Sequence, residues 1–314
     1  MTKKFLLVAL ALTAIFSCRQ APSTELQTRK FPVLQIPGVI TQEAEVLEYA
    51  SLHLWDAFAD TSALWLNDSL HIAGVPVVDI EQNLSSYCEA VSKLPENVRQ
   101  QAVEALYNNI CKFRPGEAYE KMLELVERYM YDPNSPVRDE ELYLPFVSAL
   151  EKDESLSEAE RGAYTFTKEM CSLNRTGRKA ADFSFSDKNG RIYKLSGIKA
   201  DYTLLFFSNP GCTACKNIIE YLRDDPATSE MIESGKLAVV NIYIDEDIEA
   251  WMGYMSFYPD NWYNGYDHNG IIRGDTLYNV RAIPSLYLLD SEKRVILKDA
   301  PENRVFEFLS GISL

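Results

Sequence analysis

Two cysteines spaced Cys-x-x-Cys, Cys212 and Cys215, are the residues of this sequence with the clearest chemistry. They follow the apolar run Leu204–Phe207 and the turn Asn209-Pro210-Gly211, and apolar residues at near-helical spacing come after them. This order predicts a buried strand, a turn and a helix that begins near Cys212. The N–H groups and the dipole of a helix N-terminus favour a thiolate over a thiol. Cys212 is therefore the candidate nucleophile, and Cys215 is placed to resolve a mixed disulfide.

The rest of the chain argues against two other uses of a Cys-x-x-Cys pair. A zinc site needs a second cluster of ligands, and the remaining cysteines and the three histidines form none. Covalent haem attachment needs a histidine after the second cysteine, where this chain has Lys216. A purely structural disulfide stays open as an alternative. We favour redox chemistry and expect neither a metal nor a cofactor.

From about Ala180 to the C-terminus the chain resembles the membrane-tethered, thioredoxin-fold thiol-disulfide oxidoreductases that include the periplasmic reductases of cytochrome maturation. The matching parts are the entry segment 181–183 with the turn 188–190, the strand and cysteines above, and the segment 282–290. The resemblance implies that Pro284 is cis and lies against the cysteines, and that the backbone of Ile283 pairs with the substrate chain. It also implies protein disulfides as substrates and a transmembrane thiol carrier as electron donor.

The proton acceptor of this family is missing at both of its usual positions. Thioredoxin itself has a buried aspartate six residues before the first cysteine, where this chain has Phe206. The haem-maturation reductases usually have a glutamate three residues after the second cysteine, where it has Ile218. One of Asp245, Glu246 and Asp247, which follow a predicted parallel strand at 237–244, could replace the acceptor. Capping of the next helix is their favoured role.

The N-terminus has the pattern of an export signal. Lys3 and Lys4 precede an apolar stretch, which ends at Ser17 and Cys18. A small residue before a cysteine at this place resembles the lipobox of bacterial lipoproteins, in which the cysteine is lipidated and becomes the first residue of the mature chain. An ordinary signal peptide is the alternative. We expect a signal peptide over 1–17 and a lipid on Cys18 that tethers a periplasm-facing protein to a cell-envelope membrane without spanning it.

The charge balance excludes one class of partner. The chain carries 31 basic and 46 acidic side chains, and loss of Lys3 and Lys4 with the signal leaves 29 basic ones, a net charge of −17. Such a surface repels nucleic acid and anionic headgroups, so we expect no nucleic-acid partner.

The 314 residues are enough for about two domains. Residues 18–40 contain several prolines and suit a flexible tether. Helical patterns follow, with Thr41 as the predicted N-cap of a first helix and Asp79 with Gln82 resembling a capping box. We predict an all-helical domain over 41–176 and an α/β thioredoxin domain over 177–314. Further helices in the first domain are predicted at 96–113, 116–131, 139–151 and 157–173.

The helical region also resembles a known family. Its segments Tyr131–Glu141 and Asn174–Gly177 are similar to those of an N-terminal domain of unknown function in Bacteroidetes lipoproteins, where it precedes a thioredoxin-like domain. This resemblance brings no activity with it. Cys88 and Cys111 would be staggered by roughly 10 Å in a helical hairpin, at 1.5 Å per residue, which is too far for a disulfide. We expect mostly buried thiols outside the Cys-x-x-Cys pair.

Taken together, the residues predict a lipid-tethered thiol-disulfide oxidoreductase that faces the periplasm. The dipeptide Thr213-Ala214 between the cysteines contains no histidine to stabilise the thiolate strongly, which predicts a reductase and not a strong oxidant. The competing hypothesis is a cell-envelope binding lipoprotein whose helical domain captures a protein or peptide. In that case the Cys-x-x-Cys pair would only support the structure.

Overall fold

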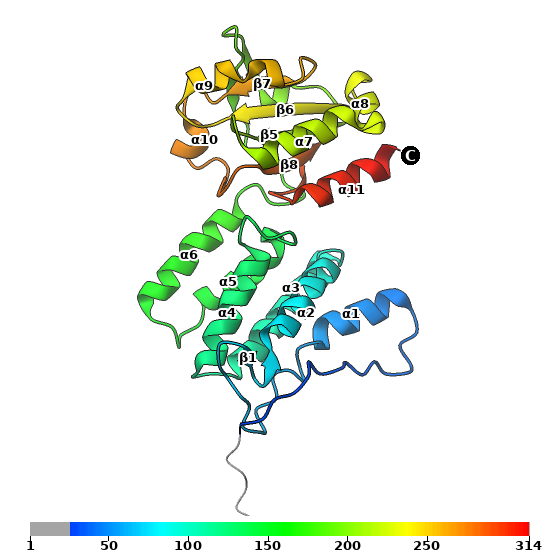
Figure 1. Cartoon of the computed structure of the whole chain (residues 1–314), viewed down its shortest axis with the longest axis vertical. Helices are drawn as coiled ribbons and strands as arrows, with labels where there is room; N and C mark the ends of the chain where they lie inside the picture. Colours follow the sequence, from blue (N-terminus) through cyan, green and yellow to red (C-terminus); the bar gives the residue numbers. More distant parts are fainter. Residues whose placement is uncertain (1–25, 314) are drawn as a thin grey trace, which may run out of the picture.

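The computed structural model describes residues 26–313, which form a helical domain and a sheet-containing domain at opposite ends of the molecule's long axis (Figure 1). The predicted signal peptide at 1–17 and Cys18 lie outside the described residues. The predicted order of a helical part followed by an α/β part is confirmed.

Six helices and a short hairpin form the N-terminal domain. The four helices predicted after residue 95 are confirmed to within two residues at each end. The expected caps of the first two helices were wrong, because the first begins after Gln42 and the second after Pro76, neither of which caps with its side chain. The elements are α1 (Glu43–His53), β1 (His71–Ile72), β2 (Val75–Pro76), α2 (Val77–Val91), α3 (Glu96–Cys111), α4 (Glu117–Met130), α5 (Glu140–Glu151) and α6 (Glu158–Ser172).

The apolar stripes of these helices meet in one core. Leu84 on α2, Leu106 on α3, Val126 on α4 and Phe146 on α5 are all at most 1% exposed. The prediction of mostly buried thiols is confirmed within residues 26–313, where the three cysteines outside the Cys-x-x-Cys pair are free. Cys88 and Cys171 are buried and Cys111 is half-buried.

Residues 27–31, which we expected in the flexible tether, instead pack on the helical domain, and we call them the N-terminal strap. Gln27 forms a parallel bridge with Trp65. The backbone N–H of Arg29 donates to the carbonyl of Gly74 at 2.8 Å. The ring of Phe31 lies edge-on to that of Trp55, with the centroids 5.5 Å apart. The strap therefore packs on the helical domain ahead of the first helix, because partial burial of Phe31 and these backbone bonds offset the entropy of ordering the strap.

A seven-stranded mixed sheet forms the second domain, with strand order β4-β3-β7-β6-β5-β8-β9. The central strands β5 and β6 are parallel, and β8 lies antiparallel to β5. The predicted hairpin turn at 188–190 is present, and β8 after Pro284 pairs antiparallel with β9. The strands are β3 (Ser184–Ser186), β4 (Ile192–Lys194), β5 (Tyr202–Phe207), β6 (Leu237–Tyr243), β7 (Tyr263–Tyr266), β8 (Ser285–Asp290) and β9 (Val295–Leu297).

Helices cover both faces of this sheet, which explains why its central strands are apolar without interruption. Leu204 and Phe206 face one helix layer, whereas Leu205 and Phe207 face the other side. Every residue of β6 is buried, so the predicted buried parallel strand is confirmed. The first face carries α7 (Thr213–Asp224), α8 (Pro226–Glu233), α9 (Ile248–Gly253) and α11 (Glu302–Ser313), and the second carries α10 (Ile271–Gly274).

Three consecutive acidic residues, Asp139, Glu140 and Glu141, lie at the start of α5, and the first two pair with cations of the sheet domain. All three are buried, at 8%, 2% and 8% exposure, and each pairs with different cations. Asp139 also caps α5 by accepting a hydrogen bond from the N–H of Glu141. The cations are Arg304 for Asp139 at 2.8 Å, Arg281 and Lys298 for Glu140 at 3.1 and 2.7 Å, and Arg175 for Glu141 at 2.7 Å.

Candidate redox site

The predicted nucleophile lies where the sequence places it, at the start of a helix. Cys212 is the N-cap of α7, and its Sγ accepts a hydrogen bond from the backbone N–H of Cys215 at 3.1 Å. The two cysteines are joined by a disulfide, with their Cα atoms 5.2 Å apart. Cys212 is partly exposed, whereas Cys215 is only 1% exposed. An incoming disulfide therefore reaches Cys212 first.

Local sequence explains this placement. Strand β5 ends at Phe207, and the chain turns through Gly211, whose φ of +75° lies in the left-handed region that glycine adopts without strain. The backbone N–H of Cys212 donates to the carbonyl of Asn209 at 3.3 Å and closes the turn. Ile218 and Leu222 then bury one face of α7 against the sheet. The helix is thus fixed with its first turn next to the C-terminal end of the central strand β5.

The loop before β8 lies against the cysteines. The Ile283–Pro284 peptide is cis, as the family resemblance implies. The Sγ of Cys212 lies 4.0 Å from the carbonyl oxygen of Ile283. All four residues expected at the site, Cys212, Cys215, Ile283 and Pro284, are therefore brought together. We call residues 279–284 the cis-proline loop.

The sheet face beneath α7 carries no acid at the position where thioredoxin has one. Phe206 is fully buried there, and its cross-strand neighbour in the register with β6 is Asn241, at 1% exposure. Asn241 accepts a hydrogen bond from Ser208 at 2.5 Å and donates one to Asn264 at 3.1 Å. These groups do not ionise near neutral pH, so they cannot serve as a base for Cys215.

The three acidic residues after β6 are engaged or exposed. Asp247 caps α9 by accepting a hydrogen bond from the N–H of Ala250 at 2.9 Å, which confirms the capping role for this residue. Asp245 accepts a hydrogen bond from Asn209 and pairs with Arg273 at 2.7 Å. Glu246 is exposed. Asp245 therefore contacts the active-site turn through Asn209.

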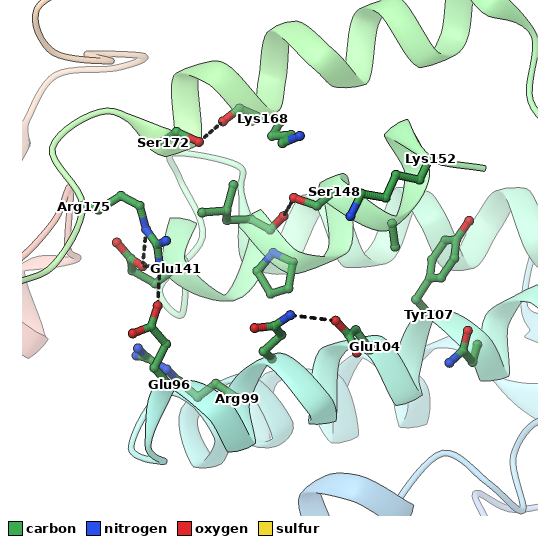
Figure 2. A pocket seen from close by; sticks show the side chains of 15 residues that line it. Glu96, Arg99, Glu104, Tyr107, Glu141, Ser148, Lys152, Lys168, Ser172 and Arg175 are labelled. Atoms are coloured by element: carbon green, nitrogen blue, oxygen red, sulfur yellow. Dashed lines mark hydrogen bonds and ion pairs between the residues drawn. The ribbon is translucent and has the colours of Figure 1, made fainter. Parts of the chain in front are cut away.

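A separate hollow of about 560 Å³ lies in the helical domain, between α3, α5 and α6 (Figure 2). Several of its charged side chains neutralise one another, since Arg175 bonds to both Glu141 and Glu96. No residue of the sheet domain lines it. Across residues 26–313, no three His, Cys, Asp or Glu side chains gather in a way that could hold a metal ion.

Sequence reasoning missed the side chains that support the cis-proline loop. Arg281 pairs with Glu140 of the helical domain and with Asp299, and Asp299 accepts a hydrogen bond from Ser285 at 2.7 Å. A usable signal was a lone arginine in the approach to Pro284. The acidic run at the start of α5 was another, although it reads equally well as a favourable helix N-terminus.

The family comparison matches the helical region. The model of a domain of unknown function, DUF5106, matches residues 13–174, which is more than half of the chain. Among curated proteins, none matches.

Solved structures match the whole chain and its second domain. A thioredoxin-like protein from Bacteroides caccae is 35% identical, with 89% of this chain and 98% of that chain covered and a TM-score of 0.76. The C-terminal domain of a protein from Bacteroides fragilis is 42% identical over 44% of this chain and 98% of that chain, with a TM-score of 0.42. A thiol:disulfide interchange protein from a Bacteroides species is 23% identical over 45% of this chain and 93% of that chain, with a TM-score of 0.37.

Proposed function

Because the chain belongs to the DUF5106 family and shares the two-domain fold of a thioredoxin-like protein, we propose that it is a thiol-disulfide oxidoreductase that reduces disulfides of client proteins. The observation that carries this proposal is the geometry at one helix end. The Cys212–Cys215 pair lies at the N-terminus of α7, beside the carbonyl of Ile283. A disulfide with only a structural role has no need of an exposed first cysteine.

The reaction follows from the two different environments of the cysteines. In the dithiol form, the Cys212 thiolate attacks one sulfur of a client disulfide, forms a mixed disulfide and releases one client thiolate. Cys215, as thiolate, then attacks the Sγ of Cys212, which releases the second client thiolate and forms the Cys212–Cys215 disulfide. Two electrons pass to the client. The protons of the two protein thiols end on the two client thiols.

The proton of Cys215 has no buried acid beneath α7 to accept it. The released client thiolate is a base at the right place, and water reaches the partly exposed Cys212. Asp245, hydrogen-bonded to Asn209 in the active-site turn, is a protein carboxylate that could assist. We propose that proton transfer proceeds through the client and solvent, with the carboxylate of Asp245 as an accessory base.

Client binding falls to the cis-proline loop. The backbone of Ile283 would pair with the extended client chain, as one strand pairs with another, and hold the client sulfur in front of Cys212. The contact of 4.0 Å between the Sγ of Cys212 and the carbonyl of Ile283 supports this role. Pro284 shapes the loop at this position. Recognition through the backbone tolerates many client sequences.

The proposed location is the periplasmic side of the cell envelope, with a lipid on Cys18 as the anchor. No helix within residues 26–313 is long and apolar enough to cross a membrane. The oxidised protein would regain its dithiol from a transmembrane thiol carrier. That donor supplies the two electrons that each client consumes.

The reduction potential and the turnover of a protein disulfide test the proposal together. The dithiol protein is expected to reduce insulin in a single turnover, and a Cys212→Ala variant to be inactive. The potential is expected to lie well below the value of about −120 mV that marks a strong oxidant. A potential near that value would overturn the reductase assignment. An intact disulfide that resists mild reductants, with no insulin reduction, would instead favour a binding lipoprotein.

A further inference from the structure

The cis-proline loop contacts both domains: Val280 and Ile283 pack against the apolar cores of the sheet domain, and two other side chains of the loop reach the helical domain. Its residues precede β8, and the side chain of Asn279 donates toward the hydroxyl of Tyr131 at 3.4 Å and the Oε1 of Glu140 at 3.3 Å. Arg281, two residues before Ile283, likewise reaches into the helical domain, where its guanidinium lies 3.9 Å above the ring of Tyr131 and donates to that residue's carbonyl. The polar side chains of the loop are thus held in part by the other domain.

Arg281 and Ser285 fix both ends of the Ile283–Pro284 pair through a single carboxylate. The Nη2 of Arg281 lies 2.9 Å from the Oδ2 of Asp299, and the Oδ1 of Asp299 accepts a hydrogen bond from Ser285 at 2.7 Å. Asp299 is 4% exposed. The position of the loop beside Cys212 therefore depends on where Arg281 is held.

Glu140 is the helical domain's carboxylate for Arg281. It is 2% exposed, lies 3.1 Å from Arg281 and also pairs with Lys298 at 2.7 Å. Burial raises the pKa of Glu140 above its ordinary value, although the two cations beside it act in the opposite direction. In a buried ion pair, separation of the two partners leaves each charge without compensation, which costs much free energy. The pair therefore holds the two side chains in one geometry.

We propose that Glu140 is a positioning residue for client binding: it holds Arg281, and through it the backbone of Ile283, in register with Cys212. The helical domain would then act on the redox reaction without touching the sulfur atoms. This inference rests on the proposed function for the role of the loop. Its structural part, that Glu140 orders residues 279–283, stands on the contacts alone.

The neighbouring residue provides a matched control. Asp139 is also buried, at 8% exposure, and also pairs across the domain boundary, with Arg304 of α11 at 2.8 Å. It makes no side-chain contact with the loop. Asparagine retains the N-cap function that Asp139 has on α5. Asp139→Asn therefore removes an interdomain ion pair of the same kind while leaving the support of Arg281 intact.

The experiment compares Glu140→Gln, Arg281→Lys, Asp139→Asn and the wild type, each as the full chain in its reduced form. We expect Glu140→Gln to raise the KM for insulin by roughly 2- to 30-fold with kcat nearly unchanged. The rate with hydroxyethyl disulfide, which has no peptide chain to pair with Ile283, should not change. Hydrogen exchange of the amides at 279–283 should accelerate in Glu140→Gln, and both measurements should match the wild type in Asp139→Asn.

An unchanged KM in an active protein, or unchanged exchange of the loop amides, overturns the proposal. Equal changes in Asp139→Asn overturn it too, because they would assign the effect to domain docking in general. If Glu140→Gln does not fold, Arg281→Lys decides by the same two measurements, since it keeps the charge but loses the planar contacts. If the wild type does not reduce insulin, the proposed function fails, and the exchange data still test the role of Glu140.

Discussion

The Sγ of Cys212 accepts a hydrogen bond from the backbone N–H of Cys215 at 3.1 Å, three residues into the same helix turn. After reduction the same N–H faces the Cys212 sulfur, and a hydrogen bond to the charged form favours the thiolate. The pKa of Cys212 in the dithiol form is therefore expected below the free-cysteine value of about 8.5.

Alkylation of the reduced protein at graded pH measures this pKa. One thiol of the pair, Cys212, should react quickly down to a pH below its free value, while the buried Cys215 reacts slowly. A Cys215→Ala variant identifies the fast thiol. Two equally slow thiols would contradict the expected activation.

Removal of the resolving cysteine should trap clients. In Cys215→Ala the attack on the mixed disulfide cannot occur, so client proteins should remain bonded to Cys212 and migrate as adducts that reductant releases. Cys212→Ala is the matched control and should capture far fewer, because Cys215 is 1% exposed. Equal capture by the two variants would mean that the order of attack is wrong.

Gly265 in β7 tolerates no larger side chain. A Cβ there would collide with the ring of Phe185 and lie 2.9 Å from the carbonyl oxygen of Ser186, both on the adjacent strand β3. Gly265→Ala is therefore expected to lower the free energy of unfolding by about 1–3 kcal/mol. Gly162 in α6, where an added Cβ would meet no atom within 4 Å, is the control. Its change to alanine should raise stability by about 0.5–1 kcal/mol in the same denaturant titration.

Asp153 makes the stability of the helical domain depend on pH. Burial opposes ionisation of its carboxyl, but hydrogen bonds from Arg114 and Tyr107 outweigh burial and hold its pKa well below the ordinary value of 3.8. A depressed folded pKa stabilises the fold above that ordinary value, and the contribution is lost as pH falls below it. Asp153→Asn should cost roughly 1.5–3 kcal/mol at pH 7, since hydrogen bonds to a charged group are lost.

The difference between Asp153→Asn and the wild type should shrink as pH falls below about 3.8, because protonation then removes the same charge from the wild type. Thermal unfolding of both proteins at a series of pH values measures this difference in stability. Asp224→Asn, at an exposed position, should change stability little at any pH. A pH-independent cost at Asp153 would contradict the assigned charge.

The redox centre was predictable because its determinants are local. The apolar run before Cys212, the turn at Gly211 and the spacing to Cys215 lie within a few residues of one another and specify a strand, a turn and a helix start. The cis Pro284 came from family resemblance and not from the local pattern. The local pattern predicted the wrong cap for α2. Strand β2 ends at Pro76 and the helix begins at the next residue, so Asp79 lies inside the first turn.

The support of the site was not predictable, because it depends on pairings between distant parts of the chain. Glu140 and Arg281 each read as ordinary charged residues, and only the docked domains reveal their contact. The same holds for Phe31, whose aromatic partner Trp55 lies beyond the first helix. The repeat of apolar residues, every 3.6 residues in a helix or every 2 in a strand, carries no information on such contacts.

The docked N-terminal strap determines which end of the protein lies next to the proposed membrane anchor. The strap joins the helical domain near the β1 hairpin, at the end of the molecule remote from the sheet domain (Figure 1). Under the proposed attachment through Cys18, the helical domain would lie between the membrane and the sheet domain that carries the Cys212–Cys215 pair (Figure 1). The strap thus places the proposed anchor and the Cys212–Cys215 pair at opposite ends of the protein (Figure 1).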